Sequence, residues 1–167
     1  MTRLLSGLLI VVLLAGCGYK LGEIRPTPMR SVRTLAVPTF KNKTYEPRVE
    51  VLMADTLIKA IQQDGTYTVT SDNTADAIVN CTLVHVERRS VRSVQNNVLA
   101  SAEYELVLRI TYQVTERTTG IVLMSGVVTG RANFFAAIDL QTSEAQAIPV
   151  AAQDASTQLV TTLSEGW

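Results

Sequence analysis

Three arginines, Arg88, Arg89 and Arg92, form a cluster whose chemistry suits ligand binding. They stand at the end of an apolar strand pattern and at the start of a polar segment. Guanidinium groups bind phosphates and carboxylates through paired hydrogen bonds, so the cluster predicts a site for an anionic ligand. A solvated, charged strand end has the same composition, and the sequence leaves this interpretation open. A second basic group consists of Lys41, Lys43 and Arg48.

Residues that could carry out catalysis do not form a recognisable set. The sole histidine, His85, lies between two valines in a predicted strand, which is typical of a surface or packing residue. Cys81 alternates with apolar residues of the same strand and is expected in the core. No G-x-S-x-G turn and no glycine-rich phosphate loop is present, and the carboxylates are scattered. We therefore expect neither an enzyme nor a bound metal or cofactor.

The first residues have the layout of a secretory signal. Arg3 precedes an apolar run over residues 4–15, which is shorter than the roughly twenty residues that a membrane span requires. Leu14-Ala15-Gly16-Cys17 looks like the lipobox of bacterial lipoproteins, in which cleavage before the cysteine precedes lipid attachment to its thiol. An ordinary signal followed by an incidental cysteine is the alternative. The residue after Cys17 is glycine and not aspartate, which resembles the default for export to the outer membrane.

Charge and composition exclude one class of partner. Fifteen basic residues balance fifteen acidic ones, so no overall field attracts a nucleic acid. Aromatic residues are 5% of the chain and do not alternate with the basic ones. The apolar fraction of 47% is typical of a globular protein.

Hydrophobic periodicity predicts an α+β domain. Its two helical stripes and one-faced strands fit two layers: a mixed, mostly antiparallel sheet of four to five strands with both helices on one face. The odd-numbered residues of strand 101–117 should lie on the wet face of this sheet. Pro149 lies inside the second helical pattern, so that helix either starts or kinks there. The expected elements are strand 32–40; a helix beginning near Pro47, capped by Thr44 or Glu46 and ended by Gly65; strand 66–70; strand 75–89 with a bulge or a change of face near Val84; a polar connection 90–100; strand 101–117; a turn at 118–120; strand 121–133 with close approaches or bends at Gly126 and Gly130; a connection 134–141; and helix 142–165.

Several short motifs together resemble the LptE family of lipopolysaccharide-assembly lipoproteins. The matching residues are Cys17-Gly18-Tyr19, Leu21-Gly22, the segment 32–40 with Pro38 and Phe40, then Asn42, Thr44, Glu46-Pro47 and Ala75-Asp76-Ala77.

The resemblance implies an outer-membrane lipoprotein on the periplasmic side, held by a lipid on Cys17. It implies a partner, the LptD-type β-barrel translocon, which the protein binds and stabilises, and contact with lipopolysaccharide itself. The family fold is a small sheet with two helices on one side. Charge alone suggests Arg88, Arg89 and Arg92 for the lipopolysaccharide phosphates. The expected organisation is a signal peptide at 1–16, a lipidated tether at 17–31 and one domain at 32–167.

Two other interpretations remain open at this point. The opening strand with its Phe-x-Asn-x-Thr step is also similar to periplasmic lipoproteins of curli-type secretion and to activators of peptidoglycan synthases. A lipid-anchored enzyme is the other alternative, although the sequence contains no catalytic constellation.

Overall fold

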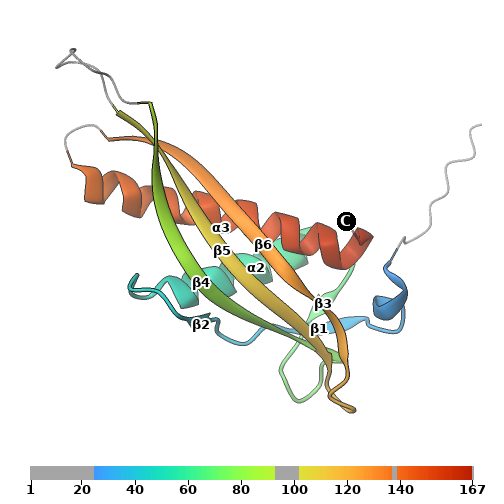
Figure 1. Ribbon diagram of the computed structural model, residues 1–167. Helices are drawn as coiled ribbons and strands as arrows, with labels where there is room; N and C mark the ends of the chain where they lie inside the picture. Colours follow the sequence, from blue (N-terminus) through green and yellow to red (C-terminus); the bar gives the residue numbers. More distant parts are fainter. Residues whose placement is uncertain (1–24, 93–101, 137–138, 167) are drawn as a thin grey trace, which may run out of the picture.

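The computed structural model describes residues 25–92, 102–136 and 139–166. The predicted signal peptide, Cys17, most of the tether and most of the 90–100 connection lie outside these residues. The structure contains a mixed sheet of six strands with the order β3-β1-β4-β5-β6, and β2 also pairs with β4 (Figure 1). The pairs β1–β3, β1–β4 and β2–β4 are parallel, whereas the pairs β4–β5 and β5–β6 are antiparallel. The elements are η1 Thr27–Met29, β1 Thr34–Ala36, β2 Lys41–Asn42, α2 Val49–Asp64, β3 Thr68–Val69, β4 Ala77–Arg92, β5 Ala102–Glu116, β6 Val122–Ala136 and α3 Leu140–Glu165.

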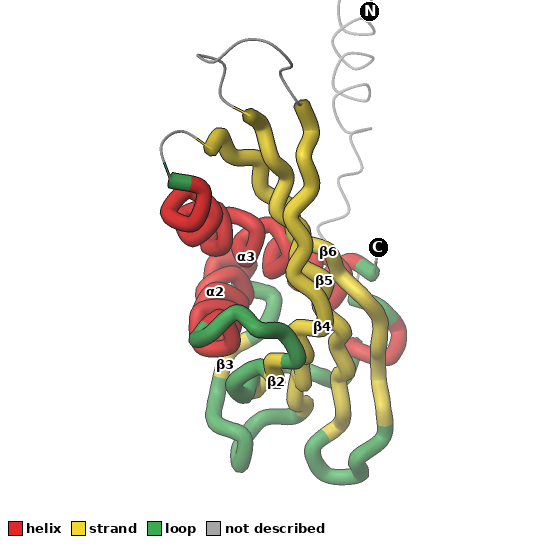
Figure 2. The backbone as a smooth tube through the Cα atoms, turned by 60° about the vertical axis from the view of Figure 1, so that its left-hand side comes forward, coloured by secondary structure: helices red, strands yellow, loops and turns green. Residues whose placement is uncertain are grey.

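Both helices pack on the same face of the sheet and leave the other face open (Figure 2). One apolar core between the two layers contains Leu57, Leu83, Leu108, Ile110 and Leu159, each at most 2% exposed. The predicted α+β class and its two-layer arrangement are therefore confirmed. The sheet has one strand more than predicted because the segment 32–40 forms β1 only as far as Ala36, and β2 follows Pro38 as a separate two-residue strand.

Strand β5 separates a dry face from a wet one, as its alternating sequence predicts. Leu106, Leu108 and Ile110 are buried, whereas Arg109 and Gln113 are exposed on the open face. A bulge interrupts the β4–β5 pairing between Leu83 and His85, which confirms the predicted change of phase. Odd-numbered positions of β5 consequently face the open side of the sheet, and the bulge decides which positions of β4 after Leu83 do so.

Strands β4 and β6 are longer than predicted. The β4 strand continues to Arg92, and β6 continues to Ala136, where the sequence predicted a connection from residue 134. The ring of Phe134 stacks on that of Tyr104 with centroids 5.7 Å apart, so pairing with β5 prolongs the strand. This cross-strand contact has no signature in the local sequence, which explains the error.

Helix α2 starts without the predicted cap. Its N-cap residue is Arg48, at φ +62°, and no side chain caps the helix there, so the expected roles of Thr44 and Glu46 are wrong. Asn42 organises the approach to the helix instead. Its Nδ2 donates to the Glu46 carbonyl oxygen at 2.7 Å and to Glu50 Oε2 at 3.0 Å, and its Oδ1 accepts from the Thr44 N–H at 2.9 Å. Gly65, at φ +76°, ends the helix as predicted.

Helix α3 is continuous through Pro149, so a start at that residue is excluded. The helix begins at Leu140 because Asp139 caps it, accepting from the Gln141 N–H at 3.0 Å. The helix lies directly against β6 at Gly130, where a side chain's Cβ would come within 2.0 Å of the Ala151 carbonyl oxygen. The close approach predicted at Gly130 is therefore confirmed.

The described part of the predicted tether packs onto the domain. Met29 is fully buried, and Arg25 donates to the carbonyl oxygens of Val32, at 2.7 Å, and Thr66, at 3.0 Å. Residues 25–31 therefore contribute to the folded domain.

Candidate functional site

The sheet divides the predicted arginine cluster between its two faces. Arg88 and Arg89 are adjacent in β4, where successive side chains point to opposite faces. Arg88 lies opposite Leu106, a core residue, and Arg89 lies opposite Glu105, an open-face residue. Arg92 lies opposite Glu103, after a shift of register between Ser90 and Arg92. The structure therefore brings Arg89 and Arg88 to different surfaces and does not join them in one site.

Arg88 takes part in a contact between the sheet and α3. Its Nη1 lies 2.5 Å from Glu144 Oε2, and its guanidinium lies 5.9 Å from the centre of the Tyr104 ring. The Glu144 side chain is 18% exposed, so water screens this ion pair less than a fully exposed one. The pair borders a shallow pocket of about 380 Å³, lined in addition by Glu46, Gln141 and Ile148. Arg88 thus has a structural partner already.

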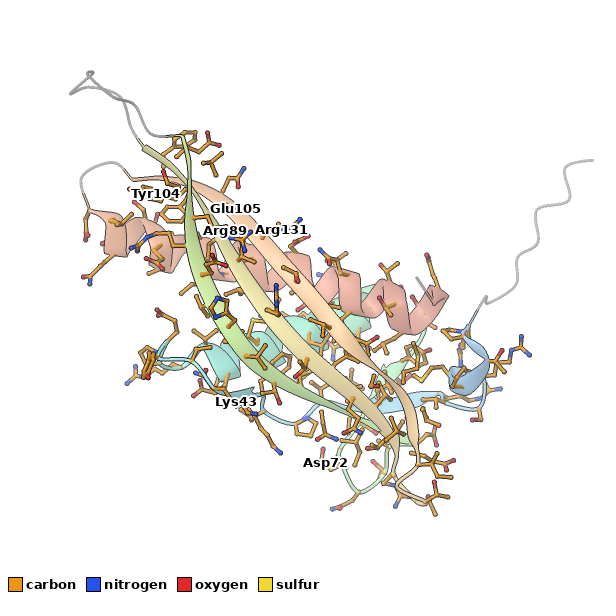
Figure 3. All side chains as sticks on the ribbon, in the orientation of Figure 1. Lys43, Asp72, Arg89, Tyr104, Glu105 and Arg131 are labelled. Carbon is orange, nitrogen blue, oxygen red and sulfur yellow. The ribbon has the colours of Figure 1, made fainter. Side chains whose placement is uncertain are left out.

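The open face carries a charged patch, which we call the open-face patch: Glu87, Arg89, Glu105 and Arg131. Figure 3 shows Arg89, Glu105 and Arg131 close together, from three neighbouring strands. Arg89 Nη2 lies 2.7 Å from Glu87 Oε2, and Arg131 Nε lies 3.9 Å from Glu105 Oε1. The hydrogen bond from Arg89 lowers the pKa of the Glu87 carboxyl, and the same bond raises the pKa of Arg89. The patch is therefore charge-paired, and an anionic ligand would have to exchange with its carboxylates.

A buried valine lies beneath this patch. Val107 has the open-face parity of β5, but it is only 4% exposed. It stands opposite Glu87 in β4 and Arg131 in β6, whose long side chains flank it. The stems of the charged residues therefore cover an apolar centre.

The remaining candidates have no arrangement suited to catalysis. His85 is exposed on the open face, with Nε2 at 3.7 Å from Glu87 Oε2. Cys81 is a core residue as predicted, and burial raises the pKa of its thiol to about 12. Lys41, Lys43 and Arg48 are exposed, and Figure 3 shows Lys43 well apart from the open-face patch. Within residues 25–92, 102–136 and 139–166, no three potential metal ligands come together. None of the helices described for this chain combines the length and apolarity needed to cross a bilayer.

The sequence reasoning missed the partners of the arginines. Glu105 and Arg131 lie 26 positions apart in the chain and meet only because β5 and β6 pair. The sequence predicted the wet-face position of Glu105. Knowledge of the register between β5 and β6 would have been needed to place Glu105 next to β6. Glu144 gives no such signal, since its contact with Arg88 depends on how α3 crosses the sheet.

The fold is a small two-layer α+β domain, in which one sheet face is covered by the helices and forms the core and the other face is open. A model of the LptE family, described as lipopolysaccharide-assembly, matches residues 32–163. The chain therefore belongs to the LptE family of lipopolysaccharide-assembly lipoproteins, as the sequence motifs indicated. The role of this family is assembly and not catalysis.

Solved structures share the fold at low sequence identity. A minor lipoprotein from Acinetobacter baumannii aligns with a TM-score of 0.54 and 16% identity over 80% of this chain and 94% of its own. A PelC dodecamer from Paraburkholderia phytofirmans aligns with a TM-score of 0.53 and 15% identity over 80% and 90%. A putative neuraminyllactose-binding hemagglutinin homolog from Helicobacter pylori aligns with a TM-score of 0.54 and 11% identity over 86% and 90%. No curated protein has a significant sequence match to this chain. These structures support the fold and carry no further functional argument.

Proposed function

We propose that this protein is an outer-membrane lipoprotein, anchored through a lipid on Cys17, that binds and stabilises an LptD-type β-barrel and thereby assists lipopolysaccharide assembly. The observation that carries the proposal is the family match over residues 32–163, which spans the six strands, α2 and all but the last two residues of α3. The protein acts by binding and carries out no chemistry of its own.

The shape of the domain suits this role. Strands β4, β5 and β6 are each at least 15 residues long. The end of the sheet where β4 stops, β5 starts and β6 stops, which we call the distal end, extends past α2 and the short strands (Figures 1 and 2). A rigid arm of this kind can fill part of a wide barrel lumen and oppose its collapse. A lipid anchor at the other end of the tether confines the domain to the membrane surface, which raises its effective concentration near the barrel.

Arg88, Arg89 and Arg92 remain the arginines proposed to contact the phosphates of lipopolysaccharide, and their positions favour Arg89. Its side chain is 52% exposed and lies on the open face. A phosphate would replace the Glu87 carboxylate as the acceptor for its guanidinium, an exchange of similar hydrogen bonds. Arg88 would have to give up Glu144, which is less exposed to solvent.

Affinity purification of the tagged full chain from detergent-solubilised outer membranes tests the main proposal. We expect a large β-barrel to co-purify, and mass spectrometry of the mature amino terminus to show acylated Cys17. Recovery of a peptidoglycan synthase or of a ring of identical copies in place of the barrel would contradict it. An unmodified thiol, or residues retained ahead of Cys17, would contradict the anchoring.

The role of Arg89 has a separate test with a matched control. Arg89→Gln removes one open-face cation, whereas Arg30→Gln removes an exposed cation next to η1. We expect Arg89→Gln to weaken binding to purified lipopolysaccharide about twofold to fivefold at low salt, as for one exposed charge contact, and Arg30→Gln to leave it unchanged. Equal binding of the two variants across a salt titration would remove Arg89 from the proposed site.

A further inference from the structure

The distal part of the sheet has two strand edges that no described strand occupies. The β6 strand is the last in the order β3-β1-β4-β5-β6, so one of its edges is unpaired along the described length. The outer edge of β4 is paired by β1 and β2 only as far as Leu83, so its distal half is unpaired too. Unpaired edges present rows of N–H and C=O groups that can pair with another chain.

The β4 edge carries the features that prevent such pairing. Bulges interrupt its register between Leu83 and His85 and again between Ser90 and Arg92. Its distal residues are rich in charge, with Glu87, Arg88 and Arg89 in succession. Bulges and charged side chains are the usual devices by which natural proteins protect a free edge.

The β6 edge lacks these features. Its 15 residues contain no proline and one charged residue, Arg131. The single irregularity in its register lies near its start, where Thr115 faces Val122. Two exposed apolar side chains flank the centre of the strand: Val127 is 58% exposed and Phe135 is 59% exposed. A long, regular and weakly charged edge is the kind to which an extended segment can add as a further strand.

One hydrogen bond identifies the backbone groups that point outward. The Arg131 N–H donates to Asp154 Oδ2 of α3 at 2.9 Å, so this amide faces away from β5. In an antiparallel pair the inward and outward groups alternate, so the amides of Val127, Thr129 and Asn133 face the same way. The Asp154 carboxylate occupies one amide of this row, and no hydrogen bond joins the amides of Thr129 and Asn133 to the described residues of α3.

We infer that the β6 edge, centred on residues 127–133, pairs with an extended segment of the β-barrel partner. This inference rests on the proposed function and adds to it the mode of contact. Charge complementarity and apolar contact set the chemistry of the segment: its carboxylate takes the place of Glu105, 3.9 Å away, as the ion-pair partner of Arg131, and its apolar side chains lie near Val127 and Phe135. Main-chain hydrogen bonds supply the affinity, and these side chains supply the register.

Proline substitution separates the edge from the side chains that it carries. Thr129→Pro removes an outward N–H and places a ring on the edge, and it leaves the β5 ladder intact because that amide does not face β5. Thr129→Ala, the matched control, removes the same side chain but keeps the N–H. Each variant is co-expressed with the barrel, and the barrel that co-purifies with the tagged chain is measured.

We expect Thr129→Pro to reduce the co-purified barrel about tenfold and Thr129→Ala to change it less than about twofold. Val127→Lys is a second variant, which keeps every amide but adds a charge to the edge. We expect a similar loss of co-purified barrel from it. This variant tests the inference if Thr129→Pro does not fold. Retention of the barrel by a folded Thr129→Pro, or by Val127→Lys, would overturn the inference. A wild-type dimer that Thr129→Pro converts to a monomer would also overturn it, because the edge would then belong to a second copy. Failure of the wild-type chain to recover any barrel would instead refute the proposed function.

Discussion

Replacement of Gly130 by alanine should destabilise the domain more than any other glycine-to-alanine change in the sheet. Gly130 lies in β6 where α3 crosses it. A Cβ at this position would lie 2.0 Å from the Ala151 carbonyl oxygen, 2.8 Å from Ala155 Cβ and 3.0 Å from the Ala151 carbonyl carbon. Two of these atoms belong to the helix backbone, so relief requires α3 to move away from the sheet.

The magnitude follows from the kind of obstacle. Overpacking a well-packed core costs about 1 to 3 kcal/mol, and a backbone obstacle places Gly130→Ala at the upper end, about 3 kcal/mol. For a domain of this size, about 3 to 4 °C of Tm are lost per kcal/mol, so we expect a decrease of about 10 °C. Thermal unfolding followed by circular dichroism measures Tm, and urea unfolding measures the free energy of unfolding.

Gly126→Ala is the control for this prediction. Its Cβ would lie 2.9 Å from the Tyr112 hydroxyl oxygen and 3.0 Å from two ring carbons, and these atoms belong to the outer end of a side chain that can shift. We expect a cost below about 1 kcal/mol, since alanine also restricts the unfolded chain and so recovers part of the loss. If the two variants unfold at the same temperature, the contact between α3 and the sheet is not as close as we describe.

Two further predictions concern polar side chains that hold the chain together near β1 and α2. Asp76 Oδ2 accepts from the N–H groups of Arg33 and Thr34, both at 2.9 Å, and these bonds lower the pKa of Asp76 below its ordinary value of 3.8. Asp76→Asn should therefore lower the free energy of unfolding by about 1 kcal/mol at neutral pH. This difference in stability from the wild type should shrink as the pH falls through the lowered pKa, because the wild-type carboxylate is then protonated. A constant difference from pH 7 to pH 2 in urea unfolding would contradict this. Asn42→Ala removes the hydrogen bonds to Glu46, Glu50 and Thr44 and should lower the free energy of unfolding by about 2 kcal/mol. Lys43→Ala, at the exposed neighbouring position, is the control and should lower it by less than about 0.5 kcal/mol. Equal unfolding midpoints for the two variants would show that Asn42 does not organise this turn.

The role of Asn42 gives a physical meaning to part of the family motif. The Phe-x-Asn-x-Thr step was one of the motifs that carried the resemblance, and the structure shows that Asn42 and Thr44 form one hydrogen-bonded turn. This turn connects β2 to α2 and holds the approach to a helix that lacks a side-chain cap. The motif is therefore structural, and its presence supports the fold more directly than it supports any ligand site.

The candidate site could be predicted only in part. The arginines were found because they are close in sequence and share a chemistry. Whether Arg88 and Arg89 act together depends on strand alternation, which sends one to α3 and the other to the open face. The partners Glu105, Arg131 and Glu144 come from other elements, and no spacing within one segment relates them to the cluster.

The sequence by itself determined the features that depend on neighbours a few residues away. These include the apolar stripe of α2 and its end at Gly65, the two faces of β5 and the bulge after Leu83. Only the tertiary structure decided the contacts that join distant segments: the pairing of Glu105 with Arg131, the fit of α3 against Gly130, the prolongation of β6 by the Tyr104–Phe134 stack, and the free edge that β6 leaves. The physical reason is that periodicity and turn chemistry are properties of a short stretch of backbone. Register and packing, in contrast, minimise the free energy of many segments at once, so no single segment encodes them.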